Sequence, residues 1–304
     1  MPTMASWSPR CNPPLIDALS RKNSIMPNQQ NLQRSIEFPY VHGFSPEEQA
    51  RLAKQARFLE HKVYQGIELN NVEKLIEVGC GVGAQTEILL RRYPDLHITG
   101  IDFSSRQLAA ARQRLQDHPL AQQRLTLQQM DAGNLEYAPA SFDAAFLCWI
   151  LEHVPDPEQV LAEVRRVLKP GARLYATEVM NAAFFLSPYS PHLQQYWAAF
   201  NEHQLSLGGD PFVGAKLGHM LLRQGFRDVH TEVKTLHLDG RDPHLRHEVL
   251  QYWSELLLSA TDQLLQAERV TPELVTAMKQ ELQKLSKDPE LVFFYCFFQA
   301  SATI

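Results

Sequence analysis

The chain has 304 residues, of which 44% are hydrophobic and 21% are charged, and its formal net charge is −5. This length and composition allow one large domain with additions, or two small domains. The negative charge, and the lack of a Lys/Arg run alternating with aromatic residues, argue against nucleic acid as a partner. No apolar stretch approaches the roughly 20 residues that span a bilayer, and no signal-peptide core opens the chain, so we expect a cytoplasmic protein without a membrane partner.

The first 36 residues are rich in Pro, Ser, Asn and Gln and show no period, which predicts a disordered arm. Met26 is a second possible start. From Ser45, a cap residue, a proline and two acidic residues form a helix-start signature that predicts a helix to about Gly66. We assign residues 37–72 to an N-terminal lid helix.

Over residues 73–180, β-rich runs alternate with helical ones, and several of the runs are continuously apolar, as strands covered on both faces must be. This alternation predicts a parallel sheet with helices on each side, in which ligands bind at the carboxyl ends of the strands. The runs are Leu75–Gly79, His97–Asp102, Leu125–Asp131, Phe142–Trp149 and Arg173–Val179.

After Val179 the pattern changes. Residues 181–225 are aromatic and are predicted to form a substrate cap with helices near Pro191–Leu207 and Gly214–Gln224. Residues 226–304 are predicted to complete the sheet and to add two helices. Their β-rich runs are His230–Leu238 and Leu291–Ser301, and their helical patterns are Pro243–Glu268 and Thr271–Ser286.

A glycine-rich turn joins the first predicted strand to a helix, with glycine at 79, 81 and 83. Glycine there lets the backbone approach a bound nucleoside without an intervening Cβ. Asp102 ends the next strand, where it can accept hydrogen bonds from ribose hydroxyls, and Asp131 ends the third, where it can accept one from an adenine amino group, with Met130 packing on the ring. The turn is also compatible with a nicotinamide dehydrogenase, because Ala84 completes a Gly-x-Gly-x-x-Ala pattern.

Three further runs distinguish these possibilities. They are Ser141-Phe142-Asp143-Ala144-Ala145-Phe146, Trp149-Ile150-Leu151-Glu152-His153-Val154-Pro155-Asp156-Pro157 and Val167-Leu168-Lys169-Pro170-Gly171-Ala172-Arg173-Leu174. With the glycine turn, they resemble the class I methyltransferases, specifically the ubiquinone/menaquinone C-methyltransferase-like superfamily, over residues 70 to 180. The resemblance implies a doubly wound α/β fold with a seven-stranded, mostly parallel, Rossmann-like sheet that ends in an antiparallel hairpin.

The resemblance also implies S-adenosyl-L-methionine as the cofactor and a lid over it formed by the run from Tyr40 to Phe44. Residues near the methionine end of the cofactor would be Glu77, Gly79, Cys80, Gly81, Gly83 and Trp149. Residues near its ribose and adenine would be Asp102, Phe103, Met130, Asp131 and Ala132.

Methyl transfer from a sulfonium is an in-line displacement, so alignment of the reactants can supply much of the acceleration without a metal or a covalent intermediate. Tyr40 and Trp149 can stabilise the positive sulfur, or can be plain core residues. His153 can act as a base or can cap the next helix. We also expect a hydrogen-bonded pair between Tyr40 and His153 over the methyl group.

The aromatic cap predicts a small apolar or ring-shaped acceptor, methylated on O, N or C. Candidate substrate residues are Glu178, Phe184, Tyr189 and Trp197. Glu178 can equally be a solvated strand-end acid, and cap aromatics can simply pack. Two competing hypotheses stay open, an NAD-dependent oxidoreductase and a non-catalytic cofactor-binding protein, and the late amphipathic helices suit either a monomer or a homodimer.

Overall fold

The computed structural model describes residues 40–304; the arm expected over residues 1–36 lies outside the described residues, as does Cys11. Between residues 40 and 304, eight strands form one sheet in the order β3-β2-β1-β4-β5-β8-β6, and β7 pairs with β8. The strands are β1 (Lys74–Val78), β2 (His97–Asp102), β3 (Leu125–Gln129), β4 (Phe142–Cys148), β5 (Leu168–Val179), β6 (Phe185–Ser187), β7 (Arg227–Leu238) and β8 (Val292–Thr303).

The first five strands are parallel, as predicted from their apolar runs. The chain leaves β1 toward β2 and β3 and then returns to the other side of β1 as β4. The strand order therefore reverses between β1 and β4. At such a reversal the loops after neighbouring strands diverge and leave a crevice at the carboxyl ends.

The last strands are antiparallel to their neighbours and lengthen one side of the sheet. β8 pairs with β5 through its second half and with β6 through its first half, while β7 pairs along nearly all of it. Twelve residues in each of β7 and β8 give strands about 40 Å long. The fold class is as predicted, but the sheet has one strand more than the expected seven, because the short β6 was not recognised.

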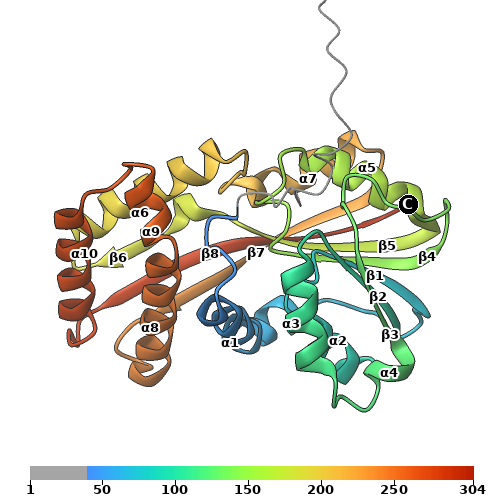
Figure 1. Cartoon of the computed structure of the whole chain (residues 1–304), viewed down its shortest axis with the longest axis horizontal. Helices are drawn as coiled ribbons and strands as arrows, with labels where there is room; N and C mark the ends of the chain where they lie inside the picture. The colour runs from blue at the N-terminus through green and yellow to red at the C-terminus, as the bar shows by residue number, and fades with distance from the viewer. Residues whose placement is uncertain (1–39) are drawn as a thin grey trace, which may run out of the picture. The chain divides into compact units, whose positions relative to one another are not determined.

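The helices lie on both faces of the sheet (Figure 1). They are α1 (Pro46–Val63), α2 (Ala84–Arg92), α3 (Ser105–Leu115), α4 (Ala121–Arg124), α5 (Pro157–Val167), α6 (Pro191–Ser206), α7 (Leu217–Arg223), α8 (Pro243–Ser259), α9 (Thr261–Gln266) and α10 (Pro272–Leu285). Buried apolar residues of α5 and α7 form a cluster on one face, whereas those of α1, α2, α6, α8 and α10 belong to a second cluster.

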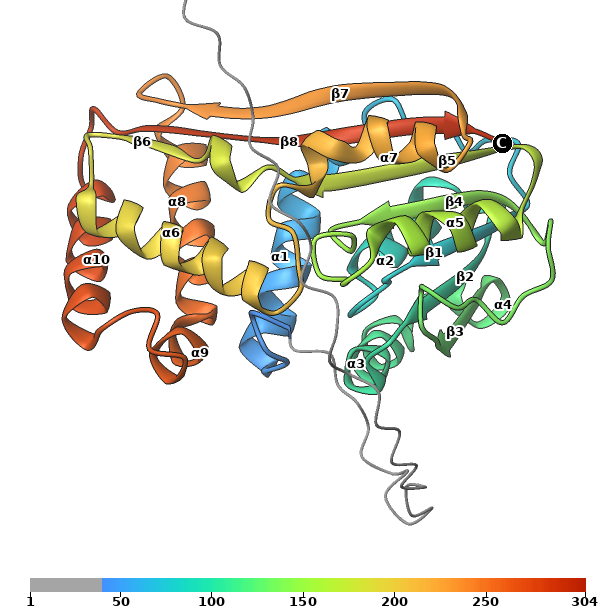
Figure 2. The same ribbon diagram turned by 90° about the horizontal axis from the view of Figure 1, so that it is seen from above.

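The predicted cap is divided between two places. Helix α6 packs against α10 and α9. These helices and α8 lie together at the end of the sheet that is formed by β6, the C-terminal half of β7 and the N-terminal half of β8 (Figure 2). Helix α7 instead contacts β7, β8 and α5, so it covers the sheet and is not part of a cap. Its buried side chains, which include Leu217 and Leu221, join the α5 cluster because apolar residues three to four apart face one side of a helix.

Helix α1 begins at the predicted place. The Ser45 hydroxyl accepts a hydrogen bond from the Glu48 backbone N–H, and Pro46 occupies the first turn. In the late region, the single helix expected over Pro243–Glu268 is instead two helices, α8 and α9, with a break at Ala260. Over residues 40–304, no helix is long and apolar enough to cross a membrane.

Candidate functional site

The glycine-rich turn lies at the carboxyl end of β1, at the point where the strand order reverses. Gly79, Gly81 and Gly83 have φ values of 73°, 52° and 72°, which L residues rarely adopt. A Cβ on Gly79 would lie 2.8 Å from the Ile150 side chain, and one on Gly83 would lie 2.9 Å from Leu115. A Cβ on Gly81 would meet nothing within 4 Å. The outer glycines therefore permit packing, while Gly81 leaves its backbone open toward the crevice.

Asp102, at the end of β2, holds this turn in place. Its Oδ2 accepts a hydrogen bond of 2.8 Å from the Gly81 N–H, and its Oδ1 accepts one of 2.8 Å from the Ser104 N–H. Burial raises the pKa of Asp102, and these two hydrogen bonds act in the opposite direction. Each carboxylate oxygen keeps a lone pair available for a ligand hydroxyl.

Glu77 lies on β1 beneath the turn and is 2% exposed. Its carboxylate accepts a hydrogen bond of 2.6 Å from the Thr86 hydroxyl on α2, and burial raises its pKa to about 8. Glu77 is not among the residues that line the crevice. The structure thus places this predicted cofactor residue behind the glycine turn.

A cleft of about 370 Å³ opens over the carboxyl ends of β1, β2 and β4. Nine of the predicted cofactor residues line it, together with the predicted catalytic residues Tyr40 and His153. The nine are Gly79, Cys80, Gly81, Asp102, Phe103, Met130, Asp131, Ala132 and Trp149. Gly83 is not in the lining and fixes the start of α2 instead. Cys80, like Cys148 and Cys296, is a buried free thiol.

Tyr40, from the run before α1, and Trp149 and His153, from the loop after β4, also line the cleft. Trp149 has a φ of 60°, an unusual value for a bulky residue, and its backbone N–H donates to the Thr177 carbonyl oxygen. The rings of Tyr40 and His153 meet edge to face, with centroids 4.8 Å apart. The expected hydrogen bond between them is not formed, because the Tyr40 hydroxyl donates to Glu48 Oε1 at 3.1 Å.

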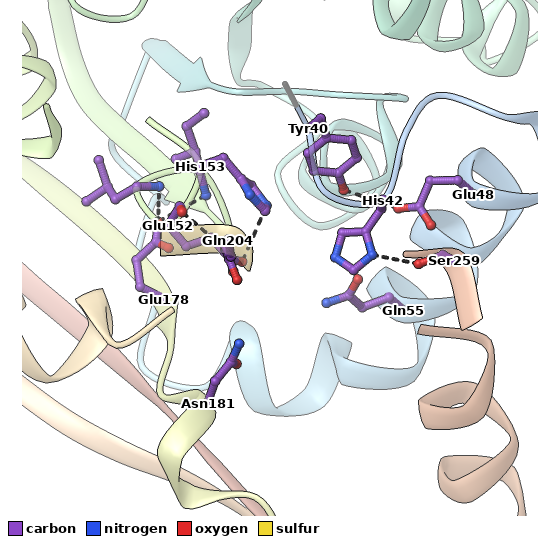
Figure 3. A network of polar contacts seen from close by, with 12 residues as sticks. Tyr40, His42, Glu48, Gln55, Glu152, His153, Glu178, Asn181, Gln204 and Ser259 are labelled. Atoms are coloured by element: carbon purple, nitrogen blue, oxygen red, sulfur yellow. Dashed lines mark hydrogen bonds and ion pairs between the residues drawn. The ribbon is translucent and has the colours of Figure 1, made fainter. Parts of the chain in front are cut away.

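His153 has a carboxylate partner. Its Nε2 is 3.6 Å from Glu152 Oε1, and Glu152 Oε2 accepts a hydrogen bond from Gln204 at 3.0 Å (Figure 3). Burial lowers the pKa of His153, whereas the Glu152 charge raises it. A neutral imidazole near a carboxylate can take a proton from a substrate, because the carboxylate stabilises the imidazolium that forms. Sequence reasoning missed this role of Glu152, although the adjacent Glu-His pair was visible.

A second, inner cavity of about 70 Å³ lies behind the cleft. The cavity adjoins the cleft, because the same residues line both spaces. They are Tyr40, Leu52, Gln55, Trp149 and His153. Its other walls come from α1, α6, α8, β7 and β8 and include the aromatic side chains of Trp197, Phe200, Tyr252, Trp253 and Tyr295.

The structure places the predicted substrate residues in different environments. Trp197 lines the inner cavity. Phe184 does not, because it is buried between Trp197, Trp253 and Phe293 in the aromatic core. Tyr189 is 76% exposed and lines neither space.

Glu178 is neither solvated nor in contact with either space, contrary to both expectations. It is fully buried at the end of β5, and its Oε1 accepts hydrogen bonds from the N–H groups of Ile150 and Leu151. Burial raises its pKa to about 8. Glu178 therefore anchors the loop that presents His153.

His42 also lines the inner cavity, and sequence reasoning named it only as part of the lid. Its Nδ1 is 2.6 Å from the Ser259 hydroxyl oxygen, 217 residues away in the chain. The Tyr40 carbonyl oxygen beside it accepts a hydrogen bond of 2.9 Å from Gln263. Both contacts tie the turn before α1 to α8 and α9, and nothing in the local sequence signals them.

Comparison with known proteins identifies the central segment. Residues 76–176 match the methyltransferase-domain family. The chain is 32% identical over 170 residues to a methyltransferase of Streptomyces halstedii, covering 55% of this chain and 60% of that protein. It is 32% identical over 143 residues to a demethylmenaquinone methyltransferase of Desulfitobacterium hafniense, covering 46% and 54% of the two proteins. The chain thus spans less than two thirds of these relatives.

Among solved structures, the [4+2]-cyclase SpnF matches with a TM-score of 0.52 and 23% identity, over 82% of each chain. This likeness shows the fold. The family match and the relatives confirm the resemblance that the sequence motifs indicate for the segment around residues 70–180.

Proposed function

We propose that this chain, which contains a class I S-adenosyl-L-methionine-dependent methyltransferase domain, transfers the methyl group of that cofactor to O, N or C of a small apolar or aromatic acceptor. The observation that supports this most directly is the adjacency of two spaces. A cleft at the carboxyl ends of the parallel strands adjoins an aromatic-lined inner cavity, and Tyr40, Trp149 and His153 lie at their junction.

The cleft fits an adenosyl cofactor. Its volume lies within the roughly 300–1,000 Å³ common for small-molecule sites. Asp102 has lone pairs for the ribose hydroxyls, and Asp131 and Met130 line the part of the cleft assigned to adenine. The open backbone at Gly81 suits close approach of the methionine portion.

The bound cofactor would supply an electrophilic methyl group on a positively charged sulfur. The rings of Tyr40 and Trp149, which line the cleft, can stabilise that charge through their faces. His153, with the Glu152 carboxylate nearby, would accept a proton from the acceptor, which we expect to lie in the inner cavity. The main contribution of the chain is to hold the reactants in line and to exclude water.

Calorimetric titration tests the cofactor assignment. The purified chain is titrated with S-adenosyl-L-methionine, S-adenosylhomocysteine and NAD, and the titrations are repeated with Asp102→Ala. We expect micromolar binding of the adenosyl ligands only, weakened about 10- to 100-fold in the variant because hydrogen bonds to a charged group are lost. Asp95→Ala is the matched control, since the Asp95 side chain is 99% exposed and away from the cleft.

Two results would reject the proposal. Binding of NAD in place of the adenosyl ligands would favour an oxidoreductase. Binding of the adenosyl ligands without release of S-adenosylhomocysteine, across a panel of hydroxyl, amine and carbon acceptors, would favour a non-catalytic cofactor-binding protein. We further expect a small-molecule acceptor, no nucleic-acid partner and a monomer or homodimer, and light scattering with and without ligand tests the last point.

A further inference from the structure

The inner cavity contains a histidine that the proposed chemistry does not yet use. His42 Nδ1 lies 2.6 Å from the hydroxyl oxygen of Ser259, and that hydroxyl is 2.8 Å from the Leu256 carbonyl oxygen, to which it donates. Because a hydroxyl has a single hydrogen, Ser259 must accept from His42. The proton of the neutral imidazole is therefore on Nδ1, and Nε2 has a free lone pair.

The orientation of the ring directs this lone pair toward the cavity. Figure 3 shows one edge of the His42 ring facing Ser259 and the opposite edge facing the space between His153 and Asn181. The ring centroids of His42 and His153 are 6.4 Å apart, and the rings are nearly perpendicular. A group bound between the two imidazoles would contact both. His42 lines the inner cavity and not the cleft, so it belongs to the acceptor side.

His42 stays neutral at physiological pH. Burial lowers its pKa well below the ordinary value, and the nearby Arg51 and His153 lower it further. Arg51 keeps its positive charge because it pairs with Glu48 at 2.6 Å and bonds to the Tyr252 hydroxyl at 3.0 Å. The unprotonated Nε2 is therefore available to a hydrogen-bond donor.

The remaining walls define what kind of donor fits. The cavity is lined by the rings of Trp197, Phe200 and Trp253, which suit a flat apolar body. Asn181 already has side-chain partners, because one amide N–H donates to Asn201 and its oxygen accepts from Tyr295. A hydroxyl nucleophile must lose its proton as it attacks, whereas a neutral amine attacks with its lone pair. A neutral base beside an aromatic cavity therefore favours a ring that bears a hydroxyl group.

We propose that the inner cavity binds an aromatic acceptor with a hydroxyl group and that His42 Nε2 accepts the proton of that hydroxyl. This inference rests on the proposed methyltransferase function, and for a hydroxyl acceptor it assigns the proton to His42 in place of His153. The hydroxyl oxygen forms a bond to the methyl carbon, and the carbon–sulfur bond breaks with its electron pair on sulfur. The hydroxyl proton moves to Nε2, and the resulting imidazolium returns it to solvent when the ether product leaves.

Phenol and toluene are the probes, because they have nearly the same size and differ in the hydroxyl. Each is titrated into the nitrogen-labelled chain saturated with S-adenosylhomocysteine, and the imidazole resonances are followed by NMR. We expect His42 to show a protonated Nδ1 and a bare Nε2, with the Nε2 signal moving on addition of phenol alone. We expect phenol to bind about fivefold tighter than toluene, as one additional neutral hydrogen bond would give.

Two variants separate this role from a structural one. His42→Asn keeps a donor near Ser259 but leaves the Nε2 position empty, so the preference for phenol should disappear. His42→Gln places an amide oxygen near the Nε2 position, so the preference should remain. With phenol as acceptor, His42→Gln should lower kcat about 100-fold with little change in KM, since an amide cannot take the proton.

Several results would overturn the proposal. They are failure of phenol to bind, equal binding of phenol and toluene, a preference for phenol that survives in His42→Asn, an unchanged kcat in His42→Gln, or faster methylation of aniline than of phenol. Binding of S-adenosylhomocysteine, measured for each variant by calorimetry, shows that the variant is folded. If that binding persists while phenol binding fails, the acceptor assignment is wrong and the cofactor assignment stands.

Discussion

Two buried carboxyl groups beside the site make stability depend on pH. Burial raises the pKa of Glu77 and of Glu178 to about 8 from the ordinary 4.5. In the unfolded chain both groups lose their protons near the ordinary value, whereas the folded chain retains them until about pH 8. Their contribution to stability is therefore fully present below about pH 4.5 and is lost as the pH rises to about 8.

Substituting Glu178→Gln should remove one of these two contributions. The glutamine oxygen can still accept from the N–H groups of Ile150 and Leu151, and the side chain cannot ionise. Each group accounts for at most about 1.4 kcal/mol per pH unit, so the fall in unfolding free energy between about pH 5 and 8 should become shallower by up to that amount. Urea denaturation at several pH values measures this dependence of the unfolding free energy on pH. Glu68→Gln, at a 75% exposed side chain, should leave the slope unchanged, and equal slopes in both variants would contradict the prediction.

At the residue scale, the sequence predicts the positions that depend on local geometry. The glycine turn and the residues directly after β2 and β3 are among these, because the carboxyl ends of parallel strands meet at one edge. The sequence does not predict which way Glu178 points, since that depends on the loop folded above it. The contact between His42 and Ser259 joins residues 217 apart in the chain, and only tertiary packing brings them together.

Among the elements, α1 contains an ion pair that fixes the lid. Arg51 and Glu48 have side chains 5% and 1% exposed, and the same Glu48 accepts from the Tyr40 hydroxyl. Replacing Arg51 would leave a buried carboxylate without its cation. The helix also has a surface pair, Lys54 with Glu255 at 2.9 Å, whose side chains are 38% and 39% exposed.

We expect Arg51→Met to lower the unfolding free energy by about 3–5 kcal/mol, because Glu48 is left buried and unpaired. Lys54→Met, on the same helix, should cost less than about 1 kcal/mol, as exposed pairs do. Urea unfolding of both variants measures the difference. The double variant Arg51→Met with Glu48→Gln should recover most of the loss. If Arg51→Met lowers the unfolding free energy as much in the Glu48→Gln chain as in the native chain, packing rather than charge is responsible.

The sequence predicts most elements because their ends have local causes. Ser45 and Thr271 each accept a backbone hydrogen bond three residues on, and each precedes a proline, so α1 and α10 begin where expected. Asp156 caps α5 in the same way, so His153 is not the cap of that helix. Strand β6 has only three residues and pairs with the distant β8, which leaves no periodic pattern to detect. The break at Ala260 is likewise not marked by glycine or proline.

Across the whole described chain, one buried cluster links the sheet to the late helices. It contains β4 and α1 residues as well as residues of α6, α8 and α10. The class of fold was predictable because alternating strands and helices with short connections permit few arrangements. The division of the predicted cap was not, because the apolar stripes of α6 and α7 look alike in sequence and reveal no partner.

This shared cluster predicts a single unfolding transition. Trp149, Trp197 and Trp253 all line the inner cavity, so with Trp7→Phe the fluorescence reports on that cavity, while far-UV circular dichroism reports on the sheet and helices together. We expect the two signals to change at the same denaturant concentration. S-adenosylhomocysteine at 100 times its dissociation constant should stabilise both by about 2.7 kcal/mol, because it binds only the folded chain. A fluorescence change at a lower denaturant concentration than the circular dichroism change would mean that the late helices unfold on their own. A fluorescence midpoint that S-adenosylhomocysteine does not shift would mean that the acceptor cavity is not energetically coupled to the cofactor cleft.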